Sequence, residues 1–429
     1  MKGAIMSHAD RPGDRIAGEF RRGTPALSRL VGGKAPVFMD APGGSQMPGC
    51  VMQAMADYIQ RGMANRHGAF ETSIETEAVL ARARQQVSDL LNADGYDIVF
   101  GQNMTSLAFA LATSLARDWA TGGRRSEVVV SEIDHHANVD PWRSVASDRG
   151  MDVRWLPVET ERVTLDLDQL DAVVTDRCAV TAVSLASNAV GTIQDAGRIA
   201  RRAREMGGIT VVDAVHAVPH VPVDLAGLGA DVLFCSAYKF FGPHIGIMAI
   251  RRELLERVRF YKVAPAPGTG PDKAELGSQN HEAAAGLCAA LDFIAALGEG
   301  STARERFASA MRAIGAYEDT LAATLAQGLA AMPGVTVFRA PDGTARTPTI
   351  AFTAATASPA QVASACGEQA VFVTNGDFYA TTLARRMGVA ESGGWIRAGL
   401  APYIGPAEVD RALTVIEQAI GAPPTRRGA

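Results

Sequence analysis

The 429-residue chain is long enough for two or three domains, and its 47% apolar and 20% charged residues are typical of a globular protein. A formal net charge of −5 argues against a broad nucleic-acid surface, which would need a basic excess. The five cysteines form no CxxC pair, so neither a disulfide framework nor a zinc site is indicated. We find no signal-peptide core and no membrane-spanning apolar run, and we expect a cytoplasmic protein.

The first two-thirds of the chain alternate between apolar strands and helices. After a polar leader, a strand at 37–40 runs into a Pro-Gly-Gly loop, and residues 75–92 carry apolar side chains at helical spacing. Apolar runs follow at 97–100, 127–131, 179–187, 209–217, 231–235 and 245–250, with helical stretches such as 196–206 between them. This alternation predicts a mostly parallel sheet covered by helices on both faces, with ligands bound at the carboxyl ends of its strands.

The pattern changes near residue 300 and predicts a smaller α+β domain. The expected elements are a helix at 301–332, strands near 335–338, 349–353 and 370–374, and helices near 359–368 and 406–420. We therefore divide the chain into a leader at 1–34, a large domain at 35–300 and a small C-terminal domain at 301–429, which also offers a surface for packing the leader.

Two charged residues stand at buried strands where an ordinary core would be apolar. Lys239 comes just past a strand and is followed by a Gly-Pro-x-x-Gly turn. Burial lowers the pKa of an ammonium group and makes the amine nucleophilic, as a Schiff-base lysine requires. Asp213 lies inside an apolar strand and needs a partner, for which a pyridinium N–H is suitable. The alternatives are a lysine that extends to solvent and an aspartate that caps a helix.

Polar residues also follow two upstream strands, at 132–138 and 186–191. A histidine in the first segment would suit stacking on a flat cofactor and proton transfer near neutral pH, although paired histidines are also common in polar loops. The sequence does not favour a metal site. His216 and His220 are separated by Pro219, which breaks a helix, and the adjacent His135 and His136 would point apart.

The order and spacing of these segments resemble fold-type I enzymes of the class V aminotransferase group, which use pyridoxal 5′-phosphate (PLP). The resemblance covers about residues 35–420 and is greatest to the cysteine desulfurase and selenocysteine lyase branch, within it to a desulfurase-like subfamily. It implies an α/β large domain with a mostly parallel seven-stranded sheet and a small C-terminal α+β domain. It also implies PLP as cofactor, an amino acid as substrate, and a homodimer with its active site between domains and at the dimer interface.

The resemblance assigns roles around the cofactor ring. Lys239 matches the Schiff-base lysine, and Asp213 matches the aspartate on the pyridine nitrogen. His135 matches the histidine that stacks on the ring and takes part in catalysis. Asn188 matches an asparagine near the ring hydroxyl, and His216 stands where a glutamine commonly contacts the ring oxygen.

The resemblance also implies a phosphate site. Met104 and Thr105 fall where the family places two threonines at a helix start, so Thr105 keeps a hydroxyl and Met104 offers only its amide. Ser236 and Tyr238 occupy positions that are usually Ser and His and reach the phosphate. Ser278 resembles the residue that a second subunit donates to that phosphate.

One departure from the family concerns the sulfur-accepting loop. In desulfurases this loop carries a mobile cysteine that takes the sulfur as a persulfide, but here residues 374–380 place Tyr379 in that position. Tyr379 is either a proton donor to the leaving group or a wall of the substrate pocket, and we favour the wall. Cys366 lies nearby in a helical stretch, where we expect it to be a small buried hydrophobe. The loss of the loop cysteine makes persulfide transfer unexpected.

The resemblance leads to an expected reaction. A substrate amine displaces Lys239, Arg397 binds the substrate α-carboxylate through its planar fork, and the freed Lys239 removes the α-proton. We expect β-elimination of a sulfur, selenium or other leaving group without persulfide transfer. If the chain is an enzyme that catalyses a different reaction, the alternative is transamination or epimerisation. The non-enzymatic alternative is a regulatory protein that binds PLP without turnover.

Overall fold

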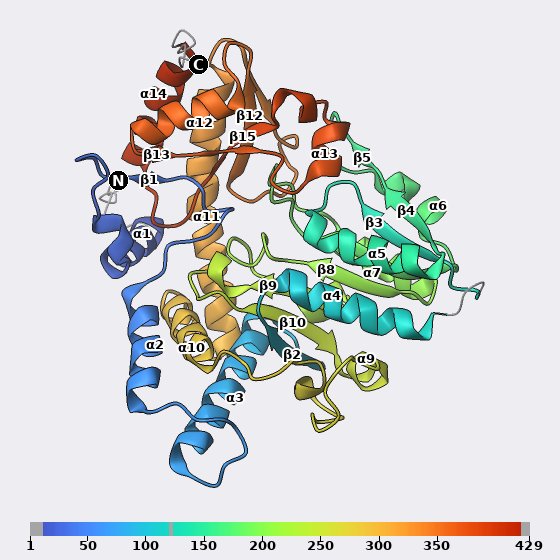
Figure 1. The fold of residues 1–429 in the computed structure, drawn as a ribbon. Coiled ribbons are helices and arrows are strands. Elements are labelled where there is room, and N and C mark those ends of the chain that lie inside the picture. The colour runs from blue at the N-terminus through green and yellow to red at the C-terminus, as the bar shows by residue number, and fades with distance from the viewer. Residues whose placement is uncertain (1–11, 120–122, 422–429) are drawn as a thin grey trace, which may run out of the picture.

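The computed structural model describes residues 12–119 and 123–421 (Figure 1). Its main sheet has seven strands in the order β2-β10-β9-β8-β7-β3-β4, and only β10 runs antiparallel to its neighbours. The strands are β2 Tyr96–Gly101, β3 Glu127–Ser131, β4 Asp152–Leu156, β7 Cys178–Ser184, β8 Ile209–Asp213, β9 Val232–Ser236 and β10 Gly246–Arg251. The expected mostly parallel seven-stranded sheet is confirmed.

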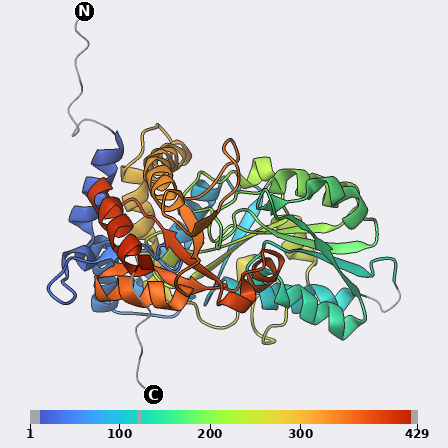
Figure 2. The ribbon, with the colours of Figure 1, turned by 90° about the horizontal axis from the view of Figure 1, so that it is seen from above.

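Helices cover both faces of this sheet because successive strand residues point to opposite sides. Leu233 and Cys235 belong to the larger apolar cluster, whereas Val232 and Phe234 belong to a second cluster on the other face. The helices of the first face are α3 Glu71–Leu91, α7 Ala196–Glu205 and α10 His281–Ala296, and those of the second are α4 Met104–Leu115, α5 Asp140–Arg149 and α9 Arg252–Arg257. Figures 1 and 2 show the sheet between these two layers.

The last third of the chain forms the expected α+β domain, drawn in orange and red in Figure 1. Its antiparallel sheet has the order β11-β12-β15-β14. The strands are β11 Val335–Phe338, β12 Thr349–Ala354, β14 Thr374–Gly376 and β15 Trp395–Gly399, and the helices are α11 Ala303–Ala330, α12 Pro359–Glu368, α13 Thr381–Arg386 and α14 Pro406–Gly421. The exact domain boundaries at residues 34 and 300 stay a prediction.

The N-terminal segment connects the two domains. Residues 1–11 of the expected leader lie outside the described residues, but α1 (Pro12–Gly23) packs on α11, and the Phe20 ring contacts Phe241 and Phe293. The short strand β1 (Val37–Phe38) pairs in parallel with β13 (Val371–Phe372). The chain between β1 and α2 (Gly49–Arg61) thus passes where the two domains meet.

The remaining strands and α-helices are short. They are β5 Val158–Glu159, β6 Thr164–Leu165, α6 Leu170–Val173 and α8 Leu225–Leu228. Within the two described ranges, no helix is both long and apolar enough to cross a membrane.

Candidate functional site

A cavity of about 320 Å³ opens at the carboxyl ends of β3, β7, β8 and β9, where the small domain meets the sheet. This is the edge at which ligands bind in parallel sheets. Eleven of the twelve predicted site residues line the cavity: Met104, Thr105, His135, Asn188, Asp213, His216, Ser236, Tyr238, Lys239, Tyr379 and Arg397. Ser278 does not; it is exposed on the segment before α10 and lines two other surface cavities.

Lys239 lies on the short turn that follows β9, and its Nζ donates a hydrogen bond to the carbonyl of Pro42. Burial, together with the positive charge of Arg397, lowers the pKa of the Lys239 amine to about 8. A substantial fraction of this amine is therefore neutral near physiological pH, which makes it both a nucleophile and a base.

Asp213 is the last residue of β8, and its carboxylate is buried at the floor of the cavity. One oxygen, Oδ1, accepts the N–H of Val215 at 2.9 Å, and no other hydrogen bond to this carboxylate comes from a described residue. Burial raises the pKa of Asp213 to about 7. The arrangement leaves a poorly compensated carboxylate, which a cationic N–H donor in the cavity would stabilise.

The loop after β3 presents His135 as a flat neutral wall. Buried Asp134 fixes this loop by accepting the N–H of Ser184 at 2.8 Å. His135 Nδ1 accepts the N–H of Ala137 at 2.9 Å, which places the proton of the neutral ring on Nε2. Burial lowers the pKa of His135 to about 4, so the ring is neutral at pH 7. The ring centroids of His135 and Tyr379 are 5.3 Å apart.

The N-terminus of α4 offers donors for an anion. Asn103 caps the helix by accepting the N–H of Ser106 at 2.8 Å. The N–H groups of Met104 and Thr105 belong to the first turn, which has no intrahelical acceptor for them. With the hydroxyls of Thr105 and Ser236 on the same cavity, these groups could hold a phosphate.

Arg397 and Asn188 each keep a buried polar atom without a partner. Arg397 Nη1 donates to the Asn188 carbonyl and Nη2 to Asp40 Oδ1, both at 3.0 Å, whereas Nε has no acceptor among the described residues. The Asn188 side chain donates to the Phe378 carbonyl at 2.8 Å, which leaves its buried Oδ1 without a donor from the same part of the chain. A bound ligand or an ordered water is the usual partner of such an atom.

His216 is linked to the small domain. Its Nε2 lies 3.0 Å from the hydroxyl of Thr347 and 2.9 Å from that of Thr349. His220 Nδ1 lies 2.8 Å from a carboxylate oxygen of buried Glu318. Both histidines are therefore engaged by protein groups, and within 12–119 and 123–421 no cluster of three or more ligating side chains could hold a metal ion.

The predicted site residues did not include eight residues that line this cavity: Pro42, Gly43, Asn103, Ala137, Ser184, Ala186, Val215 and Phe378. Pro42 and Gly43 line the cavity, and Phe378 contributes both its ring and its carbonyl. The Pro-Gly-Gly loop after a strand was a usable signal for the first two residues. Phe378 had no such signal, because its role depends on how the loop folds back onto the large domain.

The comparisons with known proteins place the chain in a family. The sequence model described as aminotransferase class-V matches residues 37–412, which is most of the chain. The chain belongs to the aminotransferase class-V family. This membership confirms the resemblance drawn from the sequence, and it makes the chain a PLP-dependent enzyme.

Several cysteine desulfurases of this family are similar to the chain. A probable cysteine desulfurase from Streptomyces coelicolor is 30% identical over 419 residues, covering 93% of this chain and 96% of its own. A cysteine desulfurase from Pectobacterium carotovorum is 28% identical over 422 residues, covering 95% and 98%. The solved cysteine desulfurase CsdA of Escherichia coli, in its S-sulfonic acid form, has a TM-score of 0.81 at 27% identity and covers 94% and 98%. The apo cysteine desulfurase of Thermococcus onnurineus, at 23% identity and TM-score 0.83 with the same coverage, supports the fold alone.

The cavity of this class V enzyme fits PLP on its own geometry. The incompletely paired Asp213 carboxylate suits a protonated pyridine nitrogen, and the low-pKa amine of Lys239 suits an aldehyde. The α4 N-terminus suits a phosphate, and His135 presents the face or edge of a neutral ring to the same space. The chemistry of the donor set thus matches each part of the cofactor.

Proposed function

We propose that this class V enzyme acts on an α-amino acid by β-elimination of a sulfur, selenium or similar group, and that the leaving group is released directly instead of being held as a protein persulfide. The observation that carries this proposal is the cavity lining, in which the PLP-type residues are present and no cysteine is. The residue at the sulfur-acceptor position is Tyr379, whose phenol is neither a soft nucleophile nor able to hold a persulfide.

The positions of the five cysteines support the absence of a persulfide. Cys178, Cys235, Cys288 and Cys366 are buried, as expected from their apolar segments, and burial raises the pKa of Cys366 to about 12. Cys50 is exposed at the start of α2, away from the cavity lining, and partial burial raises its pKa as well. A persulfide-forming cysteine needs an accessible thiolate near the substrate, and none of the five meets both conditions.

The loop that carries Tyr379 is also tied down. Phe378 and Tyr379 both have positive φ angles, 56° and 58°, which non-glycine residues rarely adopt. The Phe378 carbonyl accepts from Asn188, and the Tyr379 carbonyl accepts the N–H of His136 at 2.7 Å. The Tyr379 side chain is 71% exposed at the rim. These tethers support a fixed wall instead of a mobile arm that delivers a nucleophile.

The other roles in the proposed reaction are assigned to residues that line the cavity. When bound, PLP supplies an electron sink for the carbanion formed at the substrate α-carbon. Lys239 anchors the cofactor and then removes the α-proton with its neutral amine. Asp213 holds the pyridine nitrogen protonated, Arg397 orients the α-carboxylate, and His135 packs against the ring.

A screen of the common amino acids against the holoenzyme tests this proposal. Each is added, and the cofactor absorbance and the products are followed. Elimination predicts a 2-oxo acid and ammonia without consumption of a second oxo acid. An amino acid product that requires an added oxo acid would indicate transamination, and the opposite enantiomer would indicate epimerisation. Unchanged absorbance with every amino acid would favour a PLP-binding regulator without turnover.

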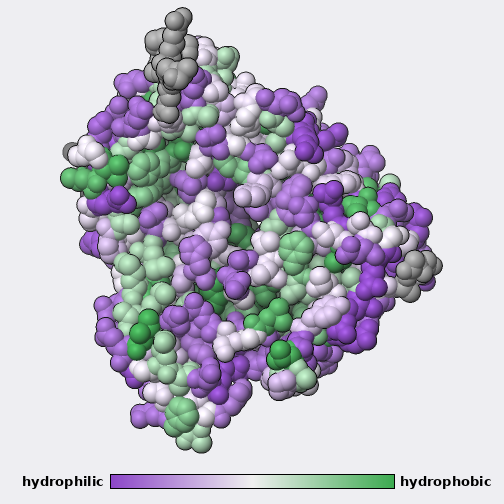
Figure 3. All heavy atoms as spheres, in the orientation of Figure 1, coloured by the Kyte–Doolittle hydropathy of each residue, from purple (hydrophilic) through white to green (hydrophobic). Residues whose placement is uncertain are grey.

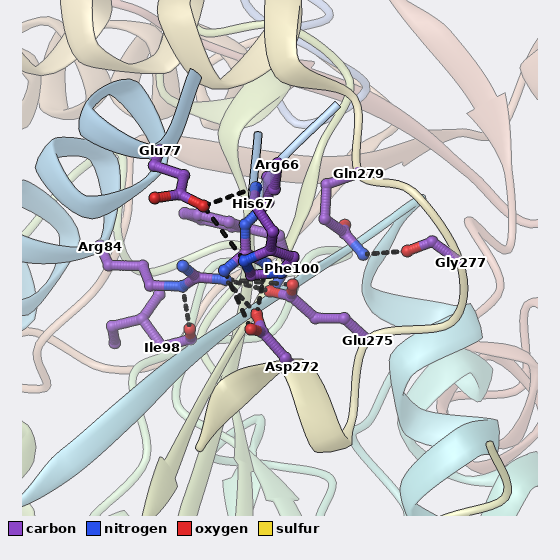
Figure 4. Close-up of polar contacts among 10 residues, drawn as sticks. All are labelled: Arg66, His67, Glu77, Arg84, Ile98, Phe100, Asp272, Glu275, Gly277 and Gln279. Atoms are coloured by element: carbon purple, nitrogen blue, oxygen red, sulfur yellow. Dashed lines mark hydrogen bonds and ion pairs between the residues drawn. The ribbon is translucent and has the colours of Figure 1, made fainter. Parts of the chain in front are cut away.

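The proposal includes a homodimer in which Ser278 completes the phosphate site of the partner subunit. The segment around Ser278 is held by a charge cluster that Figure 4 shows. Arg66 Nη1 lies 2.7 Å from Asp272, Arg84 Nη2 lies 2.9 Å from Glu275, and Glu275 accepts the N–H of Phe100 at 2.9 Å. This anchoring supports a firm platform that presents Ser278 outward.

Exposed apolar side chains around that platform support an interface. Val263, Leu276 and Ser278 line one surface cavity together with residues of the α2–α3 connection. Large exposed apolar residues continue along α2, α3 and the connection between them, at Met52, Ile59, Met63, Phe70 and Ile74. Figure 3 shows apolar side chains interrupting the polar surface over that end of the molecule. Exposed apolar patches of this kind mark protein contacts.

We therefore expect a dimer by light scattering, and we expect Leu276→Asp to shift it toward monomer with loss of bound cofactor. The matched control is Leu30→Asp, because both leucines are 64% exposed but Leu30 lies outside the Ser278 cavity. The control should remain dimeric and keep its cofactor. A wild-type monomer with full activity would contradict the dimer.

A further inference from the structure

The Arg397 guanidinium is restrained on three sides before any ligand enters. Its two Nη nitrogens donate to the Asn188 carbonyl and to the Asp40 carboxylate, and the Phe378 ring centroid lies 3.9 Å from Cζ over one face. Arg397 is only 4% exposed, and Nε alone among its nitrogens lacks an acceptor within the described residues. The guanidinium is thus held in one orientation, with Nε buried.

Asp40 is itself firmly placed relative to Arg397. The hydroxyl of Thr374 on β14 donates to the same oxygen, Oδ1, at 3.1 Å. The Asp40 backbone bridges to Gly399 of β15, and the N–H of Gly399 donates to the Met39 carbonyl at 2.7 Å. The carboxylate is therefore fixed to the strand that carries Arg397. Asp40 does not line the cavity, so it acts from behind the guanidinium.

We propose that Asp40 is a positioning residue for substrate recognition: it holds the Arg397 guanidinium in the orientation in which it meets the substrate α-carboxylate at the cavity. The inference rests on the proposed carboxylate role of Arg397. A charged acceptor on Nη2 gives a strong, directional bond, and a fork fixed in advance loses less freedom when the ligand binds. Asp40 thereby adds selectivity for amines that carry an α-carboxylate.

The same ion pair could act in the opposite direction. If Asp40 occupied the site that the ligand needs, it would compete with the substrate carboxylate, and its removal would tighten ligand binding. Positioning predicts the reverse, because a released guanidinium would sample orientations that do not suit the ligand. The sign of the change therefore separates the two cases.

The experiment titrates the PLP-loaded enzyme with L-alanine and with ethylamine, which differ by the α-carboxylate, and follows the cofactor absorbance. Asp40→Ala is expected to raise the Kd for L-alanine by roughly 10–100-fold and to leave the Kd for ethylamine unchanged. Asp40→Asn should raise the Kd for L-alanine less, because its amide oxygen still accepts a hydrogen bond from Arg397 Nη2. Thr374→Val, which removes the second bond to Oδ1, should give the same selective loss in weaker form.

The matched control is Asp342→Asn, in an exposed pair with Arg346 at 3.2 Å, and it should change neither Kd. Tighter binding of L-alanine by the Asp40 variants would show competition and overturn the proposal. Equal weakening of both ligands, with a lower melting temperature, would show a structural role only and would also overturn it. If the wild type does not prefer L-alanine and Arg397→Ala changes neither Kd, Arg397 does not bind the substrate carboxylate. The proposed role of Arg397 would then be wrong, whatever Asp40 does.

Discussion

Lys239→Ala is expected to abolish the covalent attachment of the cofactor. The wild-type enzyme should be yellow, and borohydride should bleach it and fix the cofactor to a peptide that contains Lys239. The variant should bind PLP only through its phosphate and ring contacts and lose it on gel filtration. Its turnover should fall by roughly 10³-fold, because the base for the α-proton is lost together with the anchor.

Lys273 offers a matched control for that experiment. Lys273 is also buried, and desolvation also lowers its amine pKa, but its Nζ donates to the carbonyls of Leu255 and Glu256, away from the cavity. Lys273→Ala should keep the reducible cofactor link. A reducible adduct at another lysine in the Lys239 variant would show that the anchor is misassigned.

Asp213→Asn is expected to have opposite effects on the empty and the loaded protein. In the cofactor-free protein, burial raises the Asp213 pKa from 3.8 to about 7, so the folded state holds a proton that the unfolded state has lost. This contribution to stability is full below pH 4 and declines as the pH rises to 7. Asp213→Asn removes this pH-dependent loss of stability. The free energy of unfolding of the variant, relative to that of the wild type, should therefore rise by ~4 kcal/mol between pH 4 and pH 7.

In the loaded enzyme the same substitution should be harmful. The amide cannot hold the pyridine nitrogen protonated, and we expect turnover to fall by at least about 10²-fold while some cofactor remains bound. Urea unfolding of the apoprotein at pH 4, 5.5 and 7.5, together with steady-state rates of the holoenzyme, measures both effects. Near-normal turnover, or a stability difference that does not change with pH, would contradict the proposed pairing of Asp213.

The sequence predicted the parts of the fold that have a clear pattern. Strands at 127–131 and 335–338 and the helix at 359–368 were predicted at their observed bounds, because apolar runs, helical spacing and turn residues agreed there. Strand β4 was missed because Asp152 and Arg154 give an edge strand a polar pattern. Helix α10 was missed because it is apolar on most of its surface, which removes the helical period.

The site could be predicted where strand ends meet the cavity, and not where it depends on tertiary contacts. Lys239, Asn188 and His135 follow β-strands and Asp213 ends one, so the topology brings them together. The left-handed backbone of the Phe378 loop and the Asp40 contact are fixed by partners far away in the sequence. Neither a propensity nor a spacing reports such partners.

We propose that this class V enzyme releases its leaving group without a protein persulfide, and incubation with L-cysteine tests this proposal most directly. Persulfides are labelled before mass spectrometry, and the carbon products are identified. We predict no persulfide on any of the five cysteines, and cysteine that reacts should give pyruvate, ammonia and hydrogen sulfide with the uptake of one water. Alanine as the product, with a stoichiometric persulfide on Cys366 and activity lost in Cys366→Ser, would contradict the account and restore an ordinary desulfurase with a relocated nucleophile.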